Sequence, residues 1–88
     1  MAKTYSKEWN RTLIEVKNES SRTELVIDGS TVDFFEGLVF AEGKNDYLRG
    51  YDGENHIEIR FQKIDMIIFS NIRMEFYYND RKIYECNM

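Results

Sequence analysis

Two stretches of alternating sequence decide the fold: residues 57–62 read IEIRFQ, and residues 72–78 read IRMEFYY. In both, an apolar side chain occupies every second position, and mostly polar side chains fill the positions between. A repeat of two places successive side chains on opposite faces of an extended chain, so each stretch predicts a β-strand that buries one face. Similar short stretches run from about residue 12 to residue 86, and the chain contains no proline. The sequence therefore predicts an all-β protein.

The length of 88 residues predicts one β domain that covers residues 1–88. We expect about seven to eight short strands in a small antiparallel barrel or a two-layer sheet, because either arrangement hides the sheet edges and the apolar face. The first eleven residues leave one alternative open. Ser6 could cap a short helical turn that carries Trp9, which would make the protein mainly β with one N-terminal helical turn.

Turn residues and slips in the alternation predict where strands pair. Asp28-Gly29 is a dipeptide favoured in two-residue hairpin loops. The apolar positions change from odd to even numbers after Phe61, which predicts a bulge or a tight turn near Gln62-Lys63. A single helical turn through Ile64, Ile67 and Ile68 is the alternative there.

The last hairpin can be placed by its apolar face. A three-residue loop at residues 79–81 pairs Phe76 with Tyr84 and Met74 with Cys86, whereas a two-residue loop pairs Met74 with Glu85. Burial of apolar surface outweighs the contact between Glu75 and Glu85 that the first register creates. We therefore expect the three-residue loop.

One strand, over residues 31–41, carries apolar side chains on both faces. Its alternation predicts that Val32, Phe34, Leu38 and Phe40 face the core, and that Phe35 and Val39 point the other way. Two interpretations remain open for the second pair. Phe35 and Val39 are exposed contact residues, or a two-layer fold buries both faces of this strand.

Charge is distributed unevenly along the chain. The net charge is −4, but residues 24–58 carry nine carboxylates against Lys44 and Arg49, a net of −7, while residues 1–23 carry +2 and residues 59–88 carry +1. An acidic block counts against nucleic acid as a partner, because phosphate backbones bind cationic surfaces. The alternative is a solvated face that carboxylates keep soluble.

Cellular location is predicted from the single cysteine and the N-terminal sequence. Cys86 excludes an internal disulfide, and the first residues contain no apolar run typical of a signal peptide. The longest apolar run, residues 66–69, is too short to span a bilayer. We expect a cytoplasmic protein that does not bind membranes.

Catalytic groups are sparse in this sequence. His56 is the only histidine and is expected to be an exposed strand residue, and Cys86 is expected to be a buried structural thiol. We therefore expect no enzyme activity, no cofactor and no metal. One alternative is a calcium site formed by Asp46, Asp52, Glu54 and Asn55, because oxygen ligands surround two predicted turns.

Aromatic and arginine residues that face away from the predicted core favour a binding function, since both types are enriched at protein interfaces. With the neighbouring acids they form the predicted protein-binding set: Phe35, Val39, Asp46, Tyr47, Arg49, Tyr51, Asp52, Glu54 and Tyr77. We expect a small acidic interaction module whose partner has a basic surface. An inhibitor or adaptor acting on a nucleic-acid-handling protein, as small phage inhibitors do, is one form of this hypothesis.

Two further hypotheses concern other partners. Tyr47, Arg49 and Tyr51, with the basic residues that follow them, would stack and hold single-stranded nucleic acid. The final strand, with no proline to protect its edge, could pair with a second copy of the chain and form a homodimer.

Overall fold

The computed structural model describes residues 3–19, 21–40, 44–65 and 71–88, and these residues form eight antiparallel strands and no helix. The prediction of an all-β protein is confirmed. The strands are β1 (Lys3–Trp9), β2 (Thr12–Asn18), β3 (Arg22–Ile27), β4 (Ser30–Glu36), β5 (Tyr47–Asp52), β6 (Asn55–Asp65), β7 (Asn71–Tyr78) and β8 (Arg81–Asn87).

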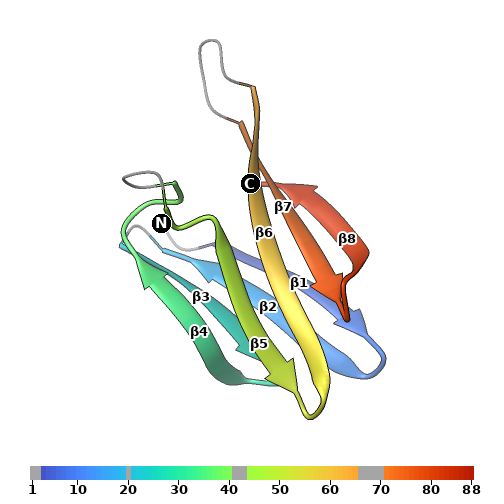
Figure 1. Cartoon of the computed structure of the whole chain (residues 1–88). Helices are drawn as coiled ribbons and strands as arrows, with labels where there is room; N and C mark the ends of the chain where they lie inside the picture. The colour runs from blue at the N-terminus through green and yellow to red at the C-terminus, as the bar shows by residue number, and fades with distance from the viewer. Residues whose placement is uncertain (1–2, 20, 41–43, 66–70) are drawn as a thin grey trace.

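The eight strands form two layers, and within each layer every strand pairs with its neighbours along the chain (Figure 1). One sheet has the order β1-β2-β3-β4 and the other the order β5-β6-β7-β8. The sheets are separate four-stranded units, so the two-layer alternative is correct and the barrel does not close. The free edges of β4 and β5 consequently lie side by side at the crossing from one sheet to the other.

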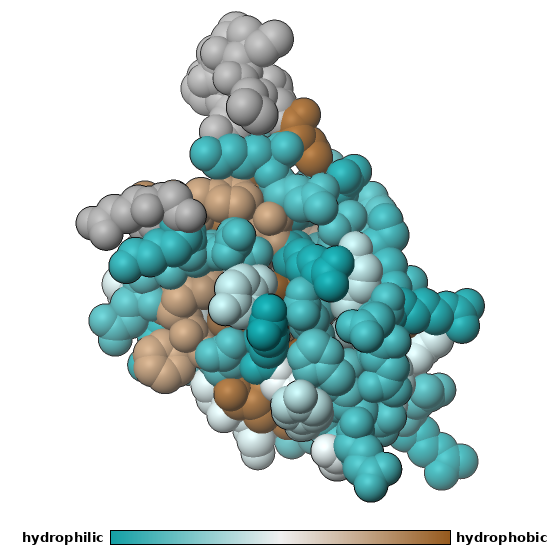
Figure 2. Space-filling model, viewed as in Figure 1, coloured by the Kyte–Doolittle hydropathy of each residue, from teal (hydrophilic) through white to brown (hydrophobic). Residues whose placement is uncertain are grey.

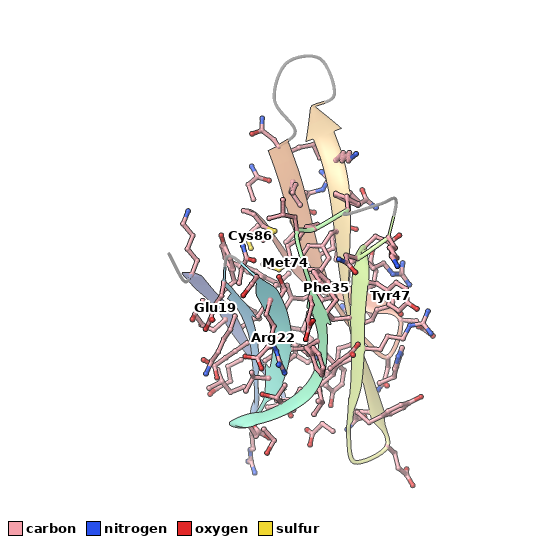
Figure 3. The ribbon with its side chains drawn as sticks, turned by 90° about the vertical axis from the view of Figure 1, so that its left-hand side faces the viewer. Glu19, Arg22, Phe35, Tyr47, Met74 and Cys86 are labelled. Carbon is pink, nitrogen blue, oxygen red and sulfur yellow. The ribbon has the colours of Figure 1, made fainter. Side chains whose placement is uncertain are left out.

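The core lies between the layers and receives side chains from both. Its buried members are Ile14, Val16, Leu25, Ile27, Leu48, Ile57, Ile59, Phe61, Met74, Phe76 and Tyr78. Side chains at every second position of β6 and β7 supply most of them, as the alternation predicts. In the side view of Figure 3, Met74 lies between the two layers, and Tyr47 lies on the outer side of β5.

Tight turns connect the paired strands. Two-residue loops at Asn10-Arg11, Asp28-Gly29 and Asn79-Asp80 all have positive φ at both positions, as type I′ turns require. The predicted hairpin at Asp28-Gly29 is confirmed. The Asp28 carboxylate also accepts a hydrogen bond from the Leu13 N–H at 2.8 Å, which ties the turn to β2.

The N-terminal residues form a strand and not the alternative helical turn. Residues 3–9 are the edge strand β1, so the proposed helical turn at Ser6 and Trp9 is wrong. Trp9 is half-buried against the core, and alternate residues of β1 face inward like those of the other strands. Pairing with β2 over the whole length of the strand supplies the backbone hydrogen bonds that a helix would otherwise provide.

The last hairpin has the predicted register but not the predicted loop. Phe76 pairs with Tyr84 and Met74 pairs with Cys86, as expected. The loop, however, has two residues, because Tyr78 pairs with Arg81. A bulge at Ile83 supplies the extra residue inside β8 and restores the apolar register.

The register of β6 also shifts near the predicted place. The shift lies between Lys63 and Asp65, just after the predicted Gln62-Lys63 position. Ile64 belongs to β6. The rest of the alternative helical turn, at Ile67 and Ile68, lies outside the described residues.

The predicted face assignment of β4 is wrong. Leu25 pairs with Asp33, whereas the adjacent Val26 pairs with Thr31, so Val32 is an extra residue in a bulge. This extra residue reverses the alternation beyond it. Phe34 is therefore exposed, and Phe35 packs inward with an edge-to-face contact to Phe61, 5.8 Å between ring centroids.

In the loop after β4, two of the three predicted apolar side chains also lie on the opposite side from the one predicted. Val39 packs against the core, and Leu38 is 70% exposed. Phe40 packs against the core as predicted. Figure 2 shows hydrophobic surface beside β4, whereas the surface over β7 and β8 is mostly hydrophilic.

Candidate functional site at the β4–β5 seam

The seam between β4 and β5 is closed at one end by direct packing. Gly50 of β5 is buried against Val32, and a Cβ atom at position 50 would lie 2.4 Å from Val32 Cγ2. At the next residue of β4, the Asp33 carboxylate accepts hydrogen bonds from the backbone N–H of Arg49 at 2.8 Å and from that of Phe34 at 2.9 Å. The Asp33 side chain therefore joins the edges of two different sheets.

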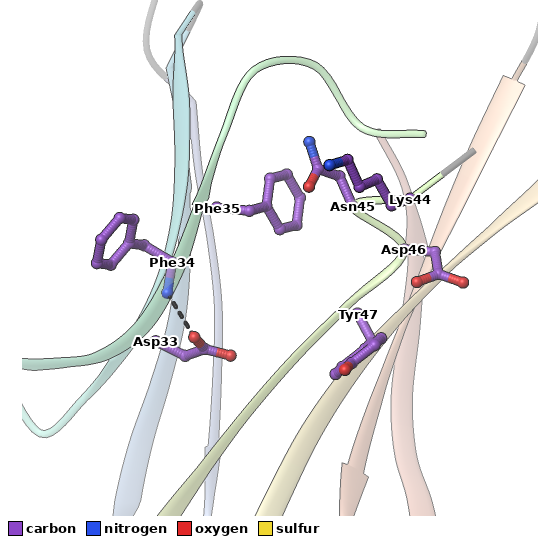
Figure 4. A pocket seen from close by; sticks show the side chains of 7 residues that line it. All are labelled: Asp33, Phe34, Phe35, Lys44, Asn45, Asp46 and Tyr47. Atoms are coloured by element: carbon purple, nitrogen blue, oxygen red, sulfur yellow. Dashed lines mark hydrogen bonds between the residues drawn. The ribbon is translucent and has the colours of Figure 1, made fainter. Parts of the chain in front are cut away.

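Beyond Asp33 the two strands diverge, and a hollow of about 260 Å³ opens between them (Figure 4). We call it the β4–β5 hollow. Phe35 points toward Asn45 from the β4 side, and Tyr47 stands on the β5 side. The complete lining is Asp33, Phe34, Phe35, Lys44, Asn45, Asp46 and Tyr47.

Asn45 holds the upper rim of this hollow. Its side-chain amide donates to the backbone carbonyls of Glu36 at 2.9 Å and Leu38 at 3.1 Å. The backbone carbonyl of Asn45 accepts a hydrogen bond from the Phe40 N–H at 3.2 Å. The φ of 62° at Asn45 is one that asparagine tolerates better than most residues. One side chain thus fixes the chain that leaves β4 against the chain that enters β5.

A second hollow of about 280 Å³ lies on the other side of Tyr47. We call it the β5–β6 hollow. Its lining is Asp46, Tyr47, Arg49, Glu58, Arg60, Phe61 and Gln62. Asp46 and Tyr47 line both hollows, so Tyr47 forms a ridge between two depressions. The ridge is 48% exposed.

A buried carboxylate organises the arginines of the β5–β6 hollow. Glu58 is buried on the outer face of β6, where it pairs with the guanidinium of Arg49 at 3.5 Å and hydrogen-bonds to that of Arg60. The bond to Glu58 raises the pKa of Arg60. Arg49 then stacks on Tyr47, with 4.4 Å from its Cζ to the ring centroid, and Arg60 stacks on Tyr77 at 4.1 Å. These stacked pairs favour the observed positions of the two aromatic rings.

A second carboxylate network covers β7 and β8. Glu75 is buried, and its oxygens accept a hydrogen bond from the Tyr77 hydroxyl at 3.2 Å and lie 3.5 Å from Lys82 Nζ. Lys82 also donates to Glu85 at 2.8 Å, which raises the pKa of Lys82 and lowers the pKa of Glu85. The outer surface of this sheet is thus an alternating array of paired charges.

Among the predicted binding residues, the aromatic–arginine group is where the sequence places it. Tyr47, Arg49 and Tyr51 lie on one outward face of β5, and Tyr51 is 65% exposed. Tyr51 also contacts the ring of His56, 5.1 Å between centroids. Tyr77 is half-buried beneath Arg60.

The other predicted residues have different positions. Phe35 and Val39 pack against the core, so the two-layer interpretation of this pair is correct. Phe35 nevertheless lines the β4–β5 hollow. Asp46 and Glu54 are exposed, whereas Asp52 accepts a hydrogen bond from the Thr12 hydroxyl and joins the two sheets.

The acidic block does not form one surface. Glu24 pairs with Arg22 at 3.2 Å, and Asp28, Asp33, Asp52 and Glu58 each have hydrogen-bond or ion-pair partners elsewhere in the fold. Asp46 and Asp52 lie at opposite ends of β5, about 20 Å apart for a strand of this length. The alternative calcium site would need these two carboxylates to converge. Within the described ranges, no three His, Cys, Asp or Glu side chains lie close enough to share a metal ion.

Sequence reasoning missed Asp33, Phe34, Asn45 and Glu58. Each owes its place to pairing between distant segments or to the Val32 bulge. Only Asn45 could have been recognised from its neighbours in the sequence, because an asparagine before an acidic residue between two strands is typical of a turn. Cys86 is half-buried, and burial raises the pKa of its thiol.

The fold and the seam define a small two-layer β protein with two neighbouring hollows where β4 and β5 adjoin. Comparison of the chain with models of known protein families, with curated proteins and with solved structures gave no match. None of the described residues belongs to a helix that could cross a membrane.

Proposed function

We propose that this chain is a cytoplasmic, non-enzymatic module that binds a protein partner at the β4–β5 seam. The observation that carries the proposal is the ridge at Tyr47 between two hollows, each large enough for a side chain of the partner. Interfaces gain most of their binding energy from a few aromatic and arginine residues beside such pockets. Tyr47 and Arg49 are of this kind, and they are stacked on each other.

The rigidity of the surface supports the proposal. Tyr47 and Arg49 belong to a strand that pairs with β6 along its whole length, and Glu58 holds Arg49 from below. Side chains that are ordered before binding lose less conformational entropy when a partner arrives. The seam is therefore suited to recognise a partner without rearrangement.

The partner is proposed to have a basic surface, as the charge of the sequence predicts. We propose that only the carboxylates at the seam contact this basic surface, and not the whole acidic block. Asp33 and Asp46 line the β4–β5 hollow, and Glu36 is exposed at the end of β4. An inhibitor or adaptor that occupies the cationic groove of a nucleic-acid-handling protein is the specific form that this chemistry suggests.

Single-stranded nucleic acid is the second candidate, and one observation favours it. Tyr47, Tyr51 and Tyr77 share the outer surface of β5 to β7 with Arg49 and Arg60, an arrangement that would allow bases to stack. However, Glu58 pairs with both arginines, so less positive charge is left for phosphates. This neutralisation supports the protein partner over the nucleic acid.

The test compares tagged proteins as baits in a lysate of the organism that encodes the chain. Tyr47→Ser removes the ridge, and Asp46→Lys in the same protein reverses the charge beside it. Leu13→Ser is the matched control, because Leu13 is also exposed but lies on β2 of the other sheet. We expect one protein retained by the wild type and the control, lost with the seam variant, and released as salt rises. Equal retention by all three baits would remove the seam from the proposal. A shift of labelled single-stranded DNA or RNA at low salt, abolished by the seam variant, would favour the second candidate.

Pairing with a second copy is a separate proposal. The structure places β8 at an edge of its sheet, as pairing requires. Light scattering over a range of concentrations should then give twice the chain mass of 10.6 kDa at the high end. A constant mass of one chain would rule out the homodimer.

A further inference from the structure

We propose that the β4–β5 hollow binds the guanidinium group of an arginine side chain on the partner protein. This inference rests on the proposed function and names the side chain that the seam recognises. It is carried by three properties of the lining, namely its charge, the free acceptor capacity of Asp33 and its aromatic walls.

Charge distinguishes the two hollows. The β4–β5 hollow is lined by Asp33 and Asp46 against one cation, Lys44, which gives a net charge of −1. The β5–β6 hollow is lined by two carboxylates and by the two arginines that pair with one of them, which gives a net charge of zero. A cationic side chain is therefore attracted to the first hollow and not to the second.

Asp33 supplies an oriented acceptor. Its two oxygens each accept one backbone N–H, from Phe34 and from Arg49, and these bonds fix the plane of the carboxylate. An ionised carboxylate has about four acceptor positions, so roughly one on each oxygen is left for a ligand. A guanidinium group presents two parallel N–H donors that match this arrangement.

Aromatic side chains form the walls of the hollow. Phe35 and Tyr47 line it from the β4 side and the β5 side, whereas the ring of Phe34, which also belongs to the lining, is turned away from them (Figure 4). Phe34 already stacks with the guanidinium of Arg22 at 3.8 Å, and Tyr47 stacks with that of Arg49 at 4.4 Å. Tyr47 is 48% exposed, and planar guanidinium stacks on such a ring better than the compact, strongly hydrated ammonium of lysine does.

Other occupants fit the lining less well. An apolar side chain would remove water from Asp33 without replacing the hydrogen bonds that water supplies. A phosphate group would meet a net negative lining. Arginine is the side chain that matches both the carboxylates and the aromatic rings.

The test is an NMR titration of the ¹⁵N-labelled protein with Nα-acetyl-arginine methylamide, and the matched control probe is the citrulline analogue, which has the same shape without the charge. We expect saturable shifts of the Phe35, Asn45 and Tyr47 amides with the arginine probe only. Asp46→Asn should weaken the affinity about fivefold, and Lys44→Gln should strengthen it by a similar factor, since each changes one charge at the rim. Opposite effects of two neutralising substitutions are not expected from a loss of structure.

Equal shifts with both probes, shifts that never saturate, or shifts confined to Tyr51 and Tyr77 would overturn the inference. Its failure can be distinguished from failure of the proposed function. A partner that the bait with Tyr47→Ser and Asp46→Lys loses but an Asp46→Asn bait retains, together with no response to the arginine probe, refutes only the guanidinium site. A lysate in which no protein depends on the seam refutes the proposed function, whatever the probe does.

Discussion

Substitution of Gly50 by alanine tests the closed end of the seam. The new Cβ would lie 2.4 Å from Val32 Cγ2, 3.1 Å from Val32 Cβ and 3.3 Å from Ile27 Cδ1. A carbon–carbon contact at 2.4 Å is far below the usual separation, so Val32 or the strand β5 must move. The φ of Gly50 is not in the left-handed region, so the cost comes from packing alone.

Overpacking of this kind costs about 1–3 kcal/mol. A domain of 88 residues has a total stability of about 4–13 kcal/mol, so the loss is a substantial part of it. Urea unfolding measures the change. With a slope of about 1 kcal/mol per molar urea, the midpoint should fall by about 1–3 M while the slope stays constant.

The double variant identifies the contact responsible. Val32→Ala removes the clashing Cγ2, and alone it should cost less than about 1 kcal/mol because Val32 is 39% exposed. Gly50→Ala with Val32→Ala should therefore be more stable than Gly50→Ala alone, with a coupling of at least about 1 kcal/mol. Additive effects of the two substitutions would show that Val32 does not pack on Gly50, and the description of the seam would be refuted.

Three other predictions concern single side chains. Asn45→Asp removes the amide donor to Glu36 and Leu38 and should lower the free energy of unfolding in urea by about 1–3 kcal/mol, whereas an unchanged value would mean that the rim does not depend on this amide. The hydrogen bond and charge of Lys82, with a smaller effect of Arg73, lower the pKa of Glu85 in the folded state. The ionised Glu85 therefore stabilises the folded protein above about pH 4.5, and this stabilisation is lost as the pH falls through the lower pKa of the folded state. Thermal melts of the wild type and of Glu85→Gln should then differ at neutral pH and converge in acid, and a constant difference would contradict this origin. Because burial raises the pKa of Cys86, its thiol should react with a disulfide reagent at pH 8 more slowly in the native protein than in denaturant, and equal rates would contradict its burial.

The strands could be predicted because their signal is local. The period of two in residues 57–62 and 72–78 places Ile57, Ile59 and Met74 in the core, as found. The register of β7 with β8 was also predictable, since only one pairing puts Met74 opposite Cys86. The loop length was not predictable, because a bulge at Ile83 compensates for a tighter turn at Asn79-Asp80.

Only the β5 residues of the site were predicted, because the rest of the site depends on contacts between distant segments. Tyr47, Arg49 and Tyr51 were found because they alternate on one strand. The β4–β5 hollow arises where two edges from different sheets diverge, and nothing local in the sequence specifies that adjacency. The adjacent rings Phe34 and Phe35 fit either face equally well, so the inserted Val32 decides which one faces inward.

Photo-crosslinking from Tyr47 tests whether a partner protein contacts the β4–β5 seam. A photoreactive phenylalanine analogue is placed at Tyr47, and in a matched protein at Leu13 on the other sheet. We expect a discrete crosslinked partner from position 47 that is absent from position 13 and that is lost as salt rises. Identical products from the two positions, or products from position 13 alone, would contradict the claim that the β4–β5 seam is the binding surface.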